Sequence, residues 1–317
     1  MSDFSALIQR LQDASHILII THISPDSDAI GSLLGLAHML RAQGKTVTPS
    51  CADPIRDRFA MLPGRAAIVT QASGPFDLVI ALDCGDALRL GSIWTNLPQP
   101  KPFLINIDHH ISNTGFGQIN WIDPAAASTA EMVLQLADLL DVPLTQEIAI
   151  CLLYGLVGDT LGFRTSNTTA QQLRYAERCM EAGASLYDSI DHQFNRRSQA
   201  LVCVWGKAIS ALKVKDRIAC TSISKAMREA CGMGTAELGL SSFLVSMNEV
   251  DRVAVLVEKD DGRVEISLRA KRGHNVAQAA VSLGGGGHAL AAGATIAGPL
   301  EAATAQVLKA LKEAQST

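Results

Sequence analysis

The residues of this sequence that could perform chemistry are acidic and imidazole side chains that follow short apolar runs. Three of them follow 17–21 (ILIIT), one follows 78–82 (LVIAL), three follow 103–107 (FLINI), and the last ends an apolar helical stretch. They are His22, Asp26, Asp28, Asp83, Asp108, His109, His110 and Asp159. Any one Asp could simply cap a helix or lie in a turn. That alternative weakens when all of them must lie at one edge of a sheet.

Four of these acids would need a compensating charge. The carboxyl ends of parallel strands lie about 4.8 Å apart and meet at one crevice. There, Asp26, Asp28, Asp83 and Asp159 would repel one another and raise one another's pKa values. Two divalent cations would balance the four negative charges. Carboxylate and imidazole ligands without thiolates suit Mn²⁺ or Mg²⁺ better than a structural zinc, so the sequence predicts two divalent cations, with Mn²⁺ preferred and Mg²⁺ as the alternative.

The elements that must position these side chains alternate between strands and helices in the first half of the chain. Continuous apolar runs predict strands that are buried on both faces, at 17–21, 47–51, 78–82 and 103–107. Helical patterns occupy 29–43, 128–140, 147–156 and 169–182. This order predicts an α/β fold with a doubly wound, mainly parallel sheet.

The pattern changes after about residue 185. The Asp260-Asp261-Gly262 segment has the chemistry of a β-hairpin turn. Strands are expected at 217–222, 252–258, 263–269 and 292–296, and helices at 237–250 and 275–283. The chain is therefore predicted to contain a first domain at 1–187, a helical linker at 188–210, and a smaller α/β domain with a mixed sheet at 211–317.

Composition excludes several classes of protein. The chain has 317 residues, 48% hydrophobic and 18% charged, the balance of a folded globular protein. Its net charge of −4 argues against binding long nucleic acid, which usually needs a basic surface. No apolar run approaches the roughly 20 residues that span a bilayer, and the first residues lack the pattern of a secretory signal. Seven scattered cysteines then read as reduced thiols, and we expect a cytoplasmic protein without a membrane partner.

A locally basic stretch lies between 263 and 288. Four cations, among them Arg269, face a single acid there, and a glycine run that ends in His288 follows. Consecutive glycines let backbone N–H groups approach an anion closely and form a nest. The stretch is thus predicted to face a phosphate. The alternatives are a solvated strand edge and a flexible turn.

Taken in order, these segments resemble the DHH phosphoesterase family. Four motifs carry the resemblance: 21–32 (THISPDSDAIGS), 81–86 (ALDCGD), 108–113 (DHHISN) and 158–164 (GDTLGFR). The segment 128–131 (STAE) also looks like the family's. At the other end, 284–288 (GGGGH) and 291–293 (AAG) resemble the DHHA1 domain. The resemblance covers about 16–170 and 252–297 and implies the two-domain architecture expected above.

The resemblance assigns the cation ligands one by one. One cation would bind His22, Asp26 and Asp83, and the other would bind Asp28, Asp83, His109 and Asp159. Asp83 would bridge the two. One position departs from the family, because Ser27 stands where glycine is usual between the two acids of the first motif. If that position needs a positive φ, Ser27 strains the loop by about 1–3 kcal/mol.

The resemblance also implies catalytic and substrate-binding residues. Catalysis would rest on Asp83, on Asp108 as the group that orients a ligand histidine, and on His110 facing the scissile phosphate. Arg164 of the first domain would contact phosphate, although it could equally cap a turn. The substrate contacts implied in the second domain are Arg269, Gly285, Gly286, Gly287 and His288.

Within the family, two-domain members of this length resemble oligoribonucleases that degrade nanoRNA and dinucleotides to mononucleotides and can convert 3′-phosphoadenosine 5′-phosphate to AMP. We therefore expect a hydrolase of short RNA oligonucleotides or nucleotides. A phosphodiesterase for cyclic or linear dinucleotides is the alternative. A non-catalytic nucleotide- or RNA-binding protein is expected to have lost cation ligands, and none is missing here. The oligomeric state is left open, a homodimer included.

Overall fold

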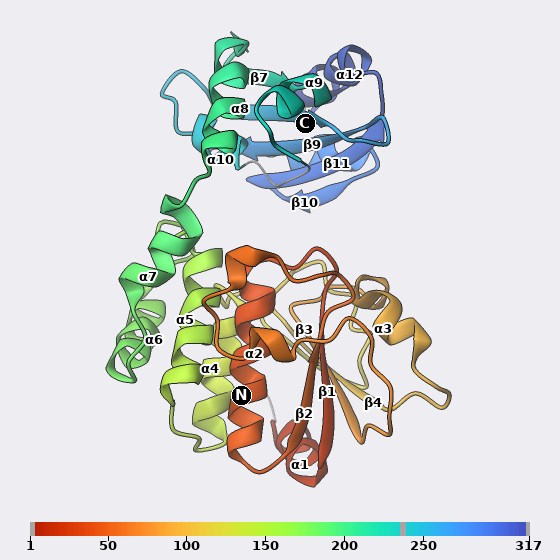
Figure 1. Ribbon diagram of the computed structural model, residues 1–317, viewed down its shortest axis with the longest axis vertical. Helices are drawn as coiled ribbons and strands as arrows, with labels where there is room; N and C mark the ends of the chain where they lie inside the picture. The colour runs from red at the N-terminus through yellow and green to blue at the C-terminus, as the bar shows by residue number, and fades with distance from the viewer. Residues whose placement is uncertain (1–3, 235–238, 315–317) are drawn as a thin grey trace. The chain divides into compact units, whose positions relative to one another are not determined.

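A computed structural model of the chain describes residues 4–234 and 239–314. The chain divides into two compact units, Met1–Arg196 and Arg197–Thr317 (Figure 1). The segment 188–210, expected as a linker, falls on both sides of this division. α7 (Leu186–Ile190) and a π-helical turn (Asp191–Asn195) belong to the first unit, and α8 (Gln199–Ser210) belongs to the second. No helix in the described ranges is both long and apolar enough to cross a membrane.

The first unit is built on a five-stranded parallel sheet in the order β2-β1-β3-β4-β5. Its strands are β1 (His16–Thr21), β2 (Thr46–Ser50), β3 (Leu78–Leu82), β4 (Phe103–Asp108) and β5 (Ile119–Ile122). This confirms the predicted parallel sheet. The strand order reverses between β1 and β3, and such a switch point is where ligands bind in open α/β sheets. β5 was not predicted, because this short edge strand is only partly buried and lacks a continuous apolar run.

Helices cover both faces of this sheet, as the doubly wound prediction requires. On one face, a single apolar core includes residues of α1 (Ser5–Asp13), α2 (Ser27–Ala42), α4 (Thr129–Leu139), α5 (Gln146–Asp159) and α6 (Ala170–Glu181). On this side α2 and α4 contact the strands, and α6 packs on α5. The other face packs against α3 (Gly91–Asn96) through Ile93, which joins Leu18 and Ile20 of β1. Successive residues of β1 point to opposite faces of the sheet. Ile17 and Ile19 therefore pack in one core, and Leu18 and Ile20 pack in the other.

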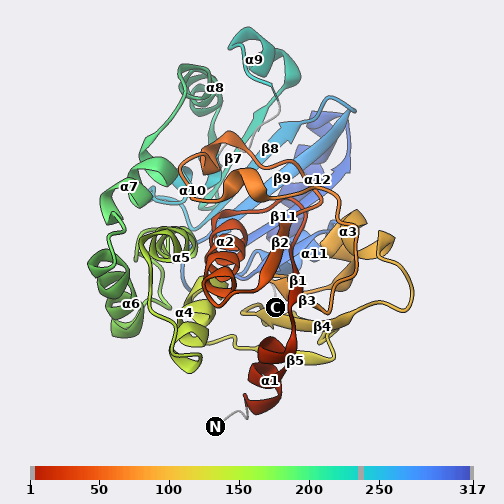
Figure 2. The same cartoon turned by 60° about the horizontal axis from the view of Figure 1, so that its bottom comes forward.

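Helices α2 and α5 lie side by side, as both ribbon views show (Figures 1 and 2). A Cβ atom added at Gly155 of α5 would meet Ala130 Cβ at 2.8 Å and Asp28 Oδ1 at 2.9 Å. A Cβ at Gly31 of α2 would meet the Cys151 carbonyl oxygen at 2.6 Å. Glycine at these positions therefore lets the two helices approach closely. The approach brings the last turn of α5 to the first turn of α2, which carries Asp28.

The second unit is built on a six-stranded mixed sheet in the order β10-β11-β9-β8-β7-β6. Its strands are β6 (Lys213–Lys215), β7 (Ile218–Ile223), β8 (Arg252–Glu258), β9 (Arg263–Ala270), β10 (Gly286–His288) and β11 (Ala291–Ala297). β7 and β8 are parallel, and the other neighbours are antiparallel. This confirms the predicted smaller α/β domain with a mixed sheet.

Two sets of helices cover the second sheet. α8, α9 (Lys225–Ala230) and α10 (Leu240–Leu244) pack on one face, and α11 (Ala277–Ser282) and α12 (Leu300–Glu313) pack on the other. The helix predicted at 237–250 is wrong in its extent. Residues 237 and 238 lie outside the described residues, and the helix ends at Leu244. Beyond it the N–H groups of Ser246 and Met247 bond three residues back, to Phe243 and Leu244, in turns.

The expectation that all seven cysteines are free thiols is wrong for two of them. Cys203 of α8 and Cys231, which directly follows α9, form a disulfide with Cα atoms 5.7 Å apart. The two residues are 28 apart in the sequence, so their proximity depends on two helices meeting on one face of the sheet. The remaining cysteines are buried and free, namely Cys51, Cys84, Cys151, Cys179 and Cys220.

Candidate metal centre

The predicted acidic and imidazole residues converge where β1, β3 and β4 end and where α5 ends. Their nitrogen and oxygen atoms form three groups within 4.8 Å: Asp83 with His109 and His110; His22 with Asp26 and Asp83; and Asp28 with His109 and Asp159. Asp83 and His109 each belong to two groups. The structure thus brings all six predicted cation ligands into one connected cluster, although Asp83 is not in the same group as Asp28.

Asp83 lies at the centre of the cluster in a strained conformation. Its φ of 55° is left-handed, which non-glycine residues adopt rarely. Oδ1 accepts a hydrogen bond from Thr129 Oγ1 (3.0 Å) and lies 3.6 Å from His109 Nε2, while Oδ2 lies 3.6 Å from His22 Nε2. Burial alone would raise the pKa of Asp83, but the nearby imidazoles of His22, His109 and His110 hold that pKa below its ordinary value. Asp83 thus directs Oδ2 toward the group that contains His22 and Oδ1 toward the group that contains His109.

Asp28 is completely buried and held by the N-terminus of α4. Oδ2 accepts from the Thr129 N–H (2.6 Å) and Oδ1 accepts from the Ala130 N–H (2.9 Å). These N–H groups have no partner within their own helix, and the helix dipole favours a negative charge there. Burial, together with the charges of Asp83 and Asp159, nevertheless raises the pKa of Asp28 well above its ordinary value. The helix end alone does not compensate the charge of the cluster.

The surroundings of His109 Nε2 show whether this site suits a cation. Its buried Nε2 has no hydrogen-bond partner within the described structure, yet it lies 3.2 Å from Asp159 Oδ2, 3.6 Å from Asp83 Oδ1 and 4.0 Å from Asp28 Oδ2. Burial would lower its pKa, but Asp159, Asp83 and Asp28 raise it to about 11. Burial raises the pKa of Asp159 to about 6. A nitrogen ligand without a partner among three carboxylates fits a divalent cation.

The group of His22, Asp26 and Asp83 is more open. His22 Nε2 lies 3.9 Å from Asp26 Oδ2, and the Asp26 side chain is 55% exposed. The other oxygen of Asp26 accepts from the Ala29 N–H (3.0 Å) and caps α2. Ser27 is the first residue of α2 and is not left-handed, so the strain considered for it does not arise. The left-handed residue of this loop is Ser24, with φ of 55°.

Asp108 orients His110 and not the predicted ligand His109. Asp108 Oδ1 lies 2.7 Å from His110 Nδ1, and Oδ2 accepts from Asn113 Nδ2 (2.5 Å). His109 Nδ1 instead faces the Ala126 carbonyl at 3.3 Å. Burial would lower the pKa of His110, but Asp108 and Asp83 raise it above its ordinary value. Asp108 therefore fixes the orientation of the His110 ring and favours its protonated form.

Three residues of the predicted glycine-His segment form a strand, which excludes the alternative of a flexible turn there. Gly286–His288 forms β10, the edge strand that pairs with β11. A Cβ at Gly285 would meet the Gly293 carbonyl oxygen at 2.1 Å, so glycine permits a close approach of the strands. His288 pairs with Ala291, which pairs with Arg269 of β9. Directly opposed residues share a face, so His288 and Arg269 project from the same face of the sheet, two strands apart.

Arg164 caps a turn in this structure. Its Nε donates to the Leu161 carbonyl oxygen (2.6 Å), and its guanidinium lies over the Phe194 ring. Leu161 and Phe163 on either side of Gly162 are left-handed, with φ of 50° and 65°. The segment that follows Asp159 is thus a strained turn directly beside the cluster, and Arg164 is exposed on it.

Two family models match the chain: the DHH family N-terminal domain over residues 16–156 and the DHHA1 domain over 222–317. Over 302 residues the chain is 36% identical to the bifunctional oligoribonuclease and PAP phosphatase NrnA of Thermus thermophilus, covering 94% of this chain and 89% of that protein. The chain belongs to the DHH family.

Two further proteins match over similar lengths. The bifunctional oligoribonuclease and PAP phosphatase NrnA of Bacillus subtilis is 26% identical over 303 residues, covering 92% of each chain. An exopolyphosphatase-related protein from Bacteroides fragilis has a crystal structure that matches with a TM-score of 0.91 and 25% identity, covering 99% of this chain and 96% of that chain. The similarity to DHH proteins therefore extends over both units.

Three residues that contact the acidic and imidazole side chains of the cluster were not predicted as part of the site. Thr129 contacts both Asp28 and Asp83, and the STAE segment that contains it was a usable signal. Asn113, which holds Asp108, lies at the end of the third motif. Arg89 places Nη2 2.9 Å from His22 Nδ1, and its position in the second motif region gave no signal beyond its charge.

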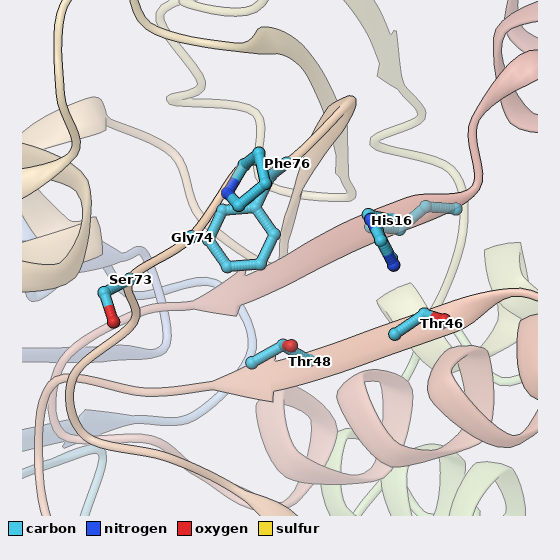
Figure 3. A pocket seen from close by; sticks show the side chains of 8 residues that line it. His16, Thr46, Thr48, Ser73, Gly74 and Phe76 are labelled. Atoms are coloured by element: carbon cyan, nitrogen blue, oxygen red, sulfur yellow. The ribbon is translucent and has the colours of Figure 1, made fainter.

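A hollow of about 160 Å³ lies elsewhere on the DHH unit (Figure 3). It is lined by His16 and Thr46 at the start of β1 and β2, by Thr48, and by the segment 73–76. The cluster of acidic and imidazole residues lies at the other end of β1, about 20 Å away for six residues of strand. The hollow is therefore separate from the chemistry described above.

Proposed function

We propose that this DHH-family protein is a hydrolase that cleaves phosphoester bonds of short nucleotides with the help of two divalent cations. The observation that carries the proposal is the buried Nε2 of His109, which has no hydrogen-bond partner in the described structure and faces three carboxylates. Such a set is unfavourable without a cation and favourable with one. The names of the NrnA relatives support the substrate class.

We assign one cation to His22, Asp26 and Asp83, and the other to Asp28, His109 and Asp159 with Asp83 shared. When bound, the two cations supply the positive charge that favours attack of water on phosphorus and stabilises the phosphoryl oxygens. Mn²⁺ is the preferred candidate because the ligands are carboxylates and imidazoles, and Mg²⁺ is the alternative.

The residues around the cations have separate tasks. The α4 N-terminus fixes both oxygens of Asp28, and Thr129 Oγ1 fixes Asp83. These contacts hold ligand carboxylates in one orientation, as supporting groups around metal sites commonly do. Asp108 binds His110 at Nδ1. The opposite ring nitrogen, Nε2, is thereby assigned to donate a hydrogen bond to the phosphate and, as the bond breaks, to stabilise the charge on its oxygens.

Short RNA oligonucleotides and 3′-phosphoadenosine 5′-phosphate are the proposed substrates. The net charge of −4 disfavours long nucleic acid. His288, Arg269 and the glycines of 285–287 in the second unit are proposed as substrate contacts, because His288 and Arg269 share a face of the sheet. Arg164 is proposed as a further contact from the first unit.

The test is release of mononucleotide from a 5′-labelled RNA dinucleotide with Mn²⁺, comparing the wild type with Asp83→Asn. Asparagine tolerates a left-handed φ better than alanine, so the variant removes charge and spares the backbone. We expect turnover to fall about 10³-fold. Equal turnover by both proteins would contradict the assignment of Asp83.

A panel of substrates separates this proposal from its alternative. It contains dinucleotides, five-residue RNA, cyclic dinucleotides and 3′-phosphoadenosine 5′-phosphate. Preference for cyclic dinucleotides would identify the phosphodiesterase named above as the alternative. Binding without turnover by a Mn²⁺-loaded wild type would identify a non-catalytic nucleotide-binding protein.

A further inference from the structure

Arg89 reaches the predicted cation ligand His22 from the turn that follows the second motif. It belongs to the 3₁₀ turn Ala87–Leu90, which begins at the capping residue Asp86. The Arg89 carbonyl accepts a hydrogen bond from the Ile23 N–H (2.8 Å), so its backbone is fixed against the first motif. Its side chain is exposed, yet Nη2 lies 2.9 Å from Nδ1 of the buried His22.

His22 Nδ1 has two neighbours that make opposite demands. The Ile23 carbonyl oxygen lies 2.7 Å away and can only accept, so it needs a proton on Nδ1. Arg89 can only donate, so it needs a lone pair on Nδ1. A single ring nitrogen cannot satisfy both partners at once. Which contact persists therefore depends on whether the other nitrogen, Nε2, carries a proton or binds a cation.

Nε2 of His22 faces the acids of the first group, with Asp83 Oδ2 at 3.6 Å and Asp26 Oδ2 at 3.9 Å. A cation bound through Nε2 uses the lone pair of that atom, and the neutral ring then carries its proton on Nδ1. Nδ1 would donate to the Ile23 carbonyl. Arg89 would lose its acceptor and would have its guanidinium donors available at the exposed edge of the cluster.

We propose that Arg89 binds a phosphate of the substrate, and that cation binding at His22 makes it available by ending its contact with Nδ1. This inference rests on the proposed function, since it names a further contact of the same site. A guanidinium offers a planar fork of donors that matches phosphate oxygens. An exposed arginine whose backbone is fixed beside a cation ligand is positioned for that contact.

The proposal predicts opposite effects of one substitution on two ligands. Arg89→Gln removes both a competitor for Nδ1 and a like charge near the cation, so Mn²⁺ should bind about 3- to 10-fold more tightly by calorimetry without nucleotide. The same variant, loaded with Mn²⁺, should bind AMP about 10- to 100-fold more weakly, because a charged hydrogen bond to phosphate is lost. Arg89→Lys keeps the charge and should bind AMP with intermediate affinity.

Arg174→Gln is the matched control, because Arg174 is an exposed arginine of α6 whose described contact is Gln171 Oε1. It should change neither affinity. Mn²⁺ affinity that is equal or weaker in Arg89→Gln would overturn the proposal and leave Arg89 as a structural support of His22. Unchanged AMP affinity would overturn it as well. A wild type that binds Mn²⁺ and AMP but cleaves no dinucleotide contradicts the proposed function and leaves both binding comparisons valid.

Discussion

The first unit buries acidic side chains next to one another, whereas the charged residues buried in the described part of the second unit are arginines. Asp28, Asp83 and Asp108 are all buried at one edge of the first sheet. In the second unit the buried charged residues are Arg228 and Arg252, which donate to the carbonyl oxygens of Glu258 and Leu311. The second unit also carries a disulfide. The difference indicates that the first unit needs a ligand to reach its full stability, because like charges adjoin one another there.

The largest expected effect is on removal of divalent cations. If each of two cations is present at about 100 times its Kd, together they stabilise the first unit by about 5 kcal/mol. EDTA should therefore lower the unfolding free energy of the first unit and leave the second unit unchanged. Hydrogen exchange resolved by peptide, with and without Mn²⁺, measures the two units separately. Equal loss of protection in both units would contradict the comparison.

The sign of the pH dependence sharpens this prediction. Burial raises the pKa of Asp159 from 3.8 to about 6, and raises that of Asp28, so the folded, cation-free protein binds more protons than the unfolded chain. Its stability should fall as pH rises through this range. Burial would lower the pKa of His109, but the carboxylates raise it to about 11. Protonated His109 therefore stabilises the fold, and this stabilisation is lost as pH rises from 6.5 toward 11. Thermal unfolding in EDTA should thus show lower stability at pH 8 than at pH 5.5, with a smaller difference in Mn²⁺.

The disulfide is expected to have the next largest effect, confined to the second unit. Closing a loop of 28 residues stabilises by about 3–4 kcal/mol in the chain-entropy description. Cys203→Ser with Cys231→Ser should therefore lower the midpoint of unfolding of the second unit, as measured by calorimetry. The matched control is Cys179→Ser in the first unit, where a buried free cysteine changes. Mn²⁺ affinity should be unchanged in the double variant.

Two glycine substitutions should change stability in opposite directions. Gly155→Ala places a Cβ 2.8 Å from Ala130 Cβ and 2.9 Å from Asp28 Oδ1, and overpacking of this kind destabilises by about 1–3 kcal/mol. Gly206→Ala in α8 meets nothing within 4 Å and should stabilise by about 0.5–1 kcal/mol through helix propensity. Urea unfolding measures both. Weaker Mn²⁺ binding by Gly155→Ala alone would link helix packing to the cluster.

The smallest effect is expected from the substrate contacts of the second unit. His288→Ala should raise KM for a dinucleotide about 10-fold with kcat within a few-fold, because it removes one contact made before and during the reaction. His274→Ala provides the control, since His274 faces Asp251, which directly precedes the inner strand β8. A fall in kcat without a change in KM would place His288 among the groups that act on the reacting phosphate.

The sequence predicted the cluster well because its residues stand at the ends of locally recognisable strands. The runs that precede His22, Asp83 and Asp108 are continuous and apolar, and each ends at the polar residue. The features that the sequence did not predict depend on partners that are distant in the chain. The strand at Gly286–His288 exists only because β11 lies beside it, and a run of glycines has no strand propensity of its own.

Side-chain partners were harder to predict than positions. Nothing in the spacing of Asp108 and the two histidines tells which imidazole it binds, because both lie within two residues. The disulfide likewise depends on how α8 and α9 meet. Arg89 and Thr129 contact the ligands from other segments, and only the folded chain brings them there.

The left-handed backbone at Asp83 has a consequence for selection experiments. Glycine is the residue that adopts this φ most readily, so the backbone alone favours Asp83→Gly, whereas the imidazoles around the side chain favour the carboxylate. A library screened for turnover should therefore keep aspartate in spite of its backbone strain. At this position the backbone and the side chain favour different amino acids.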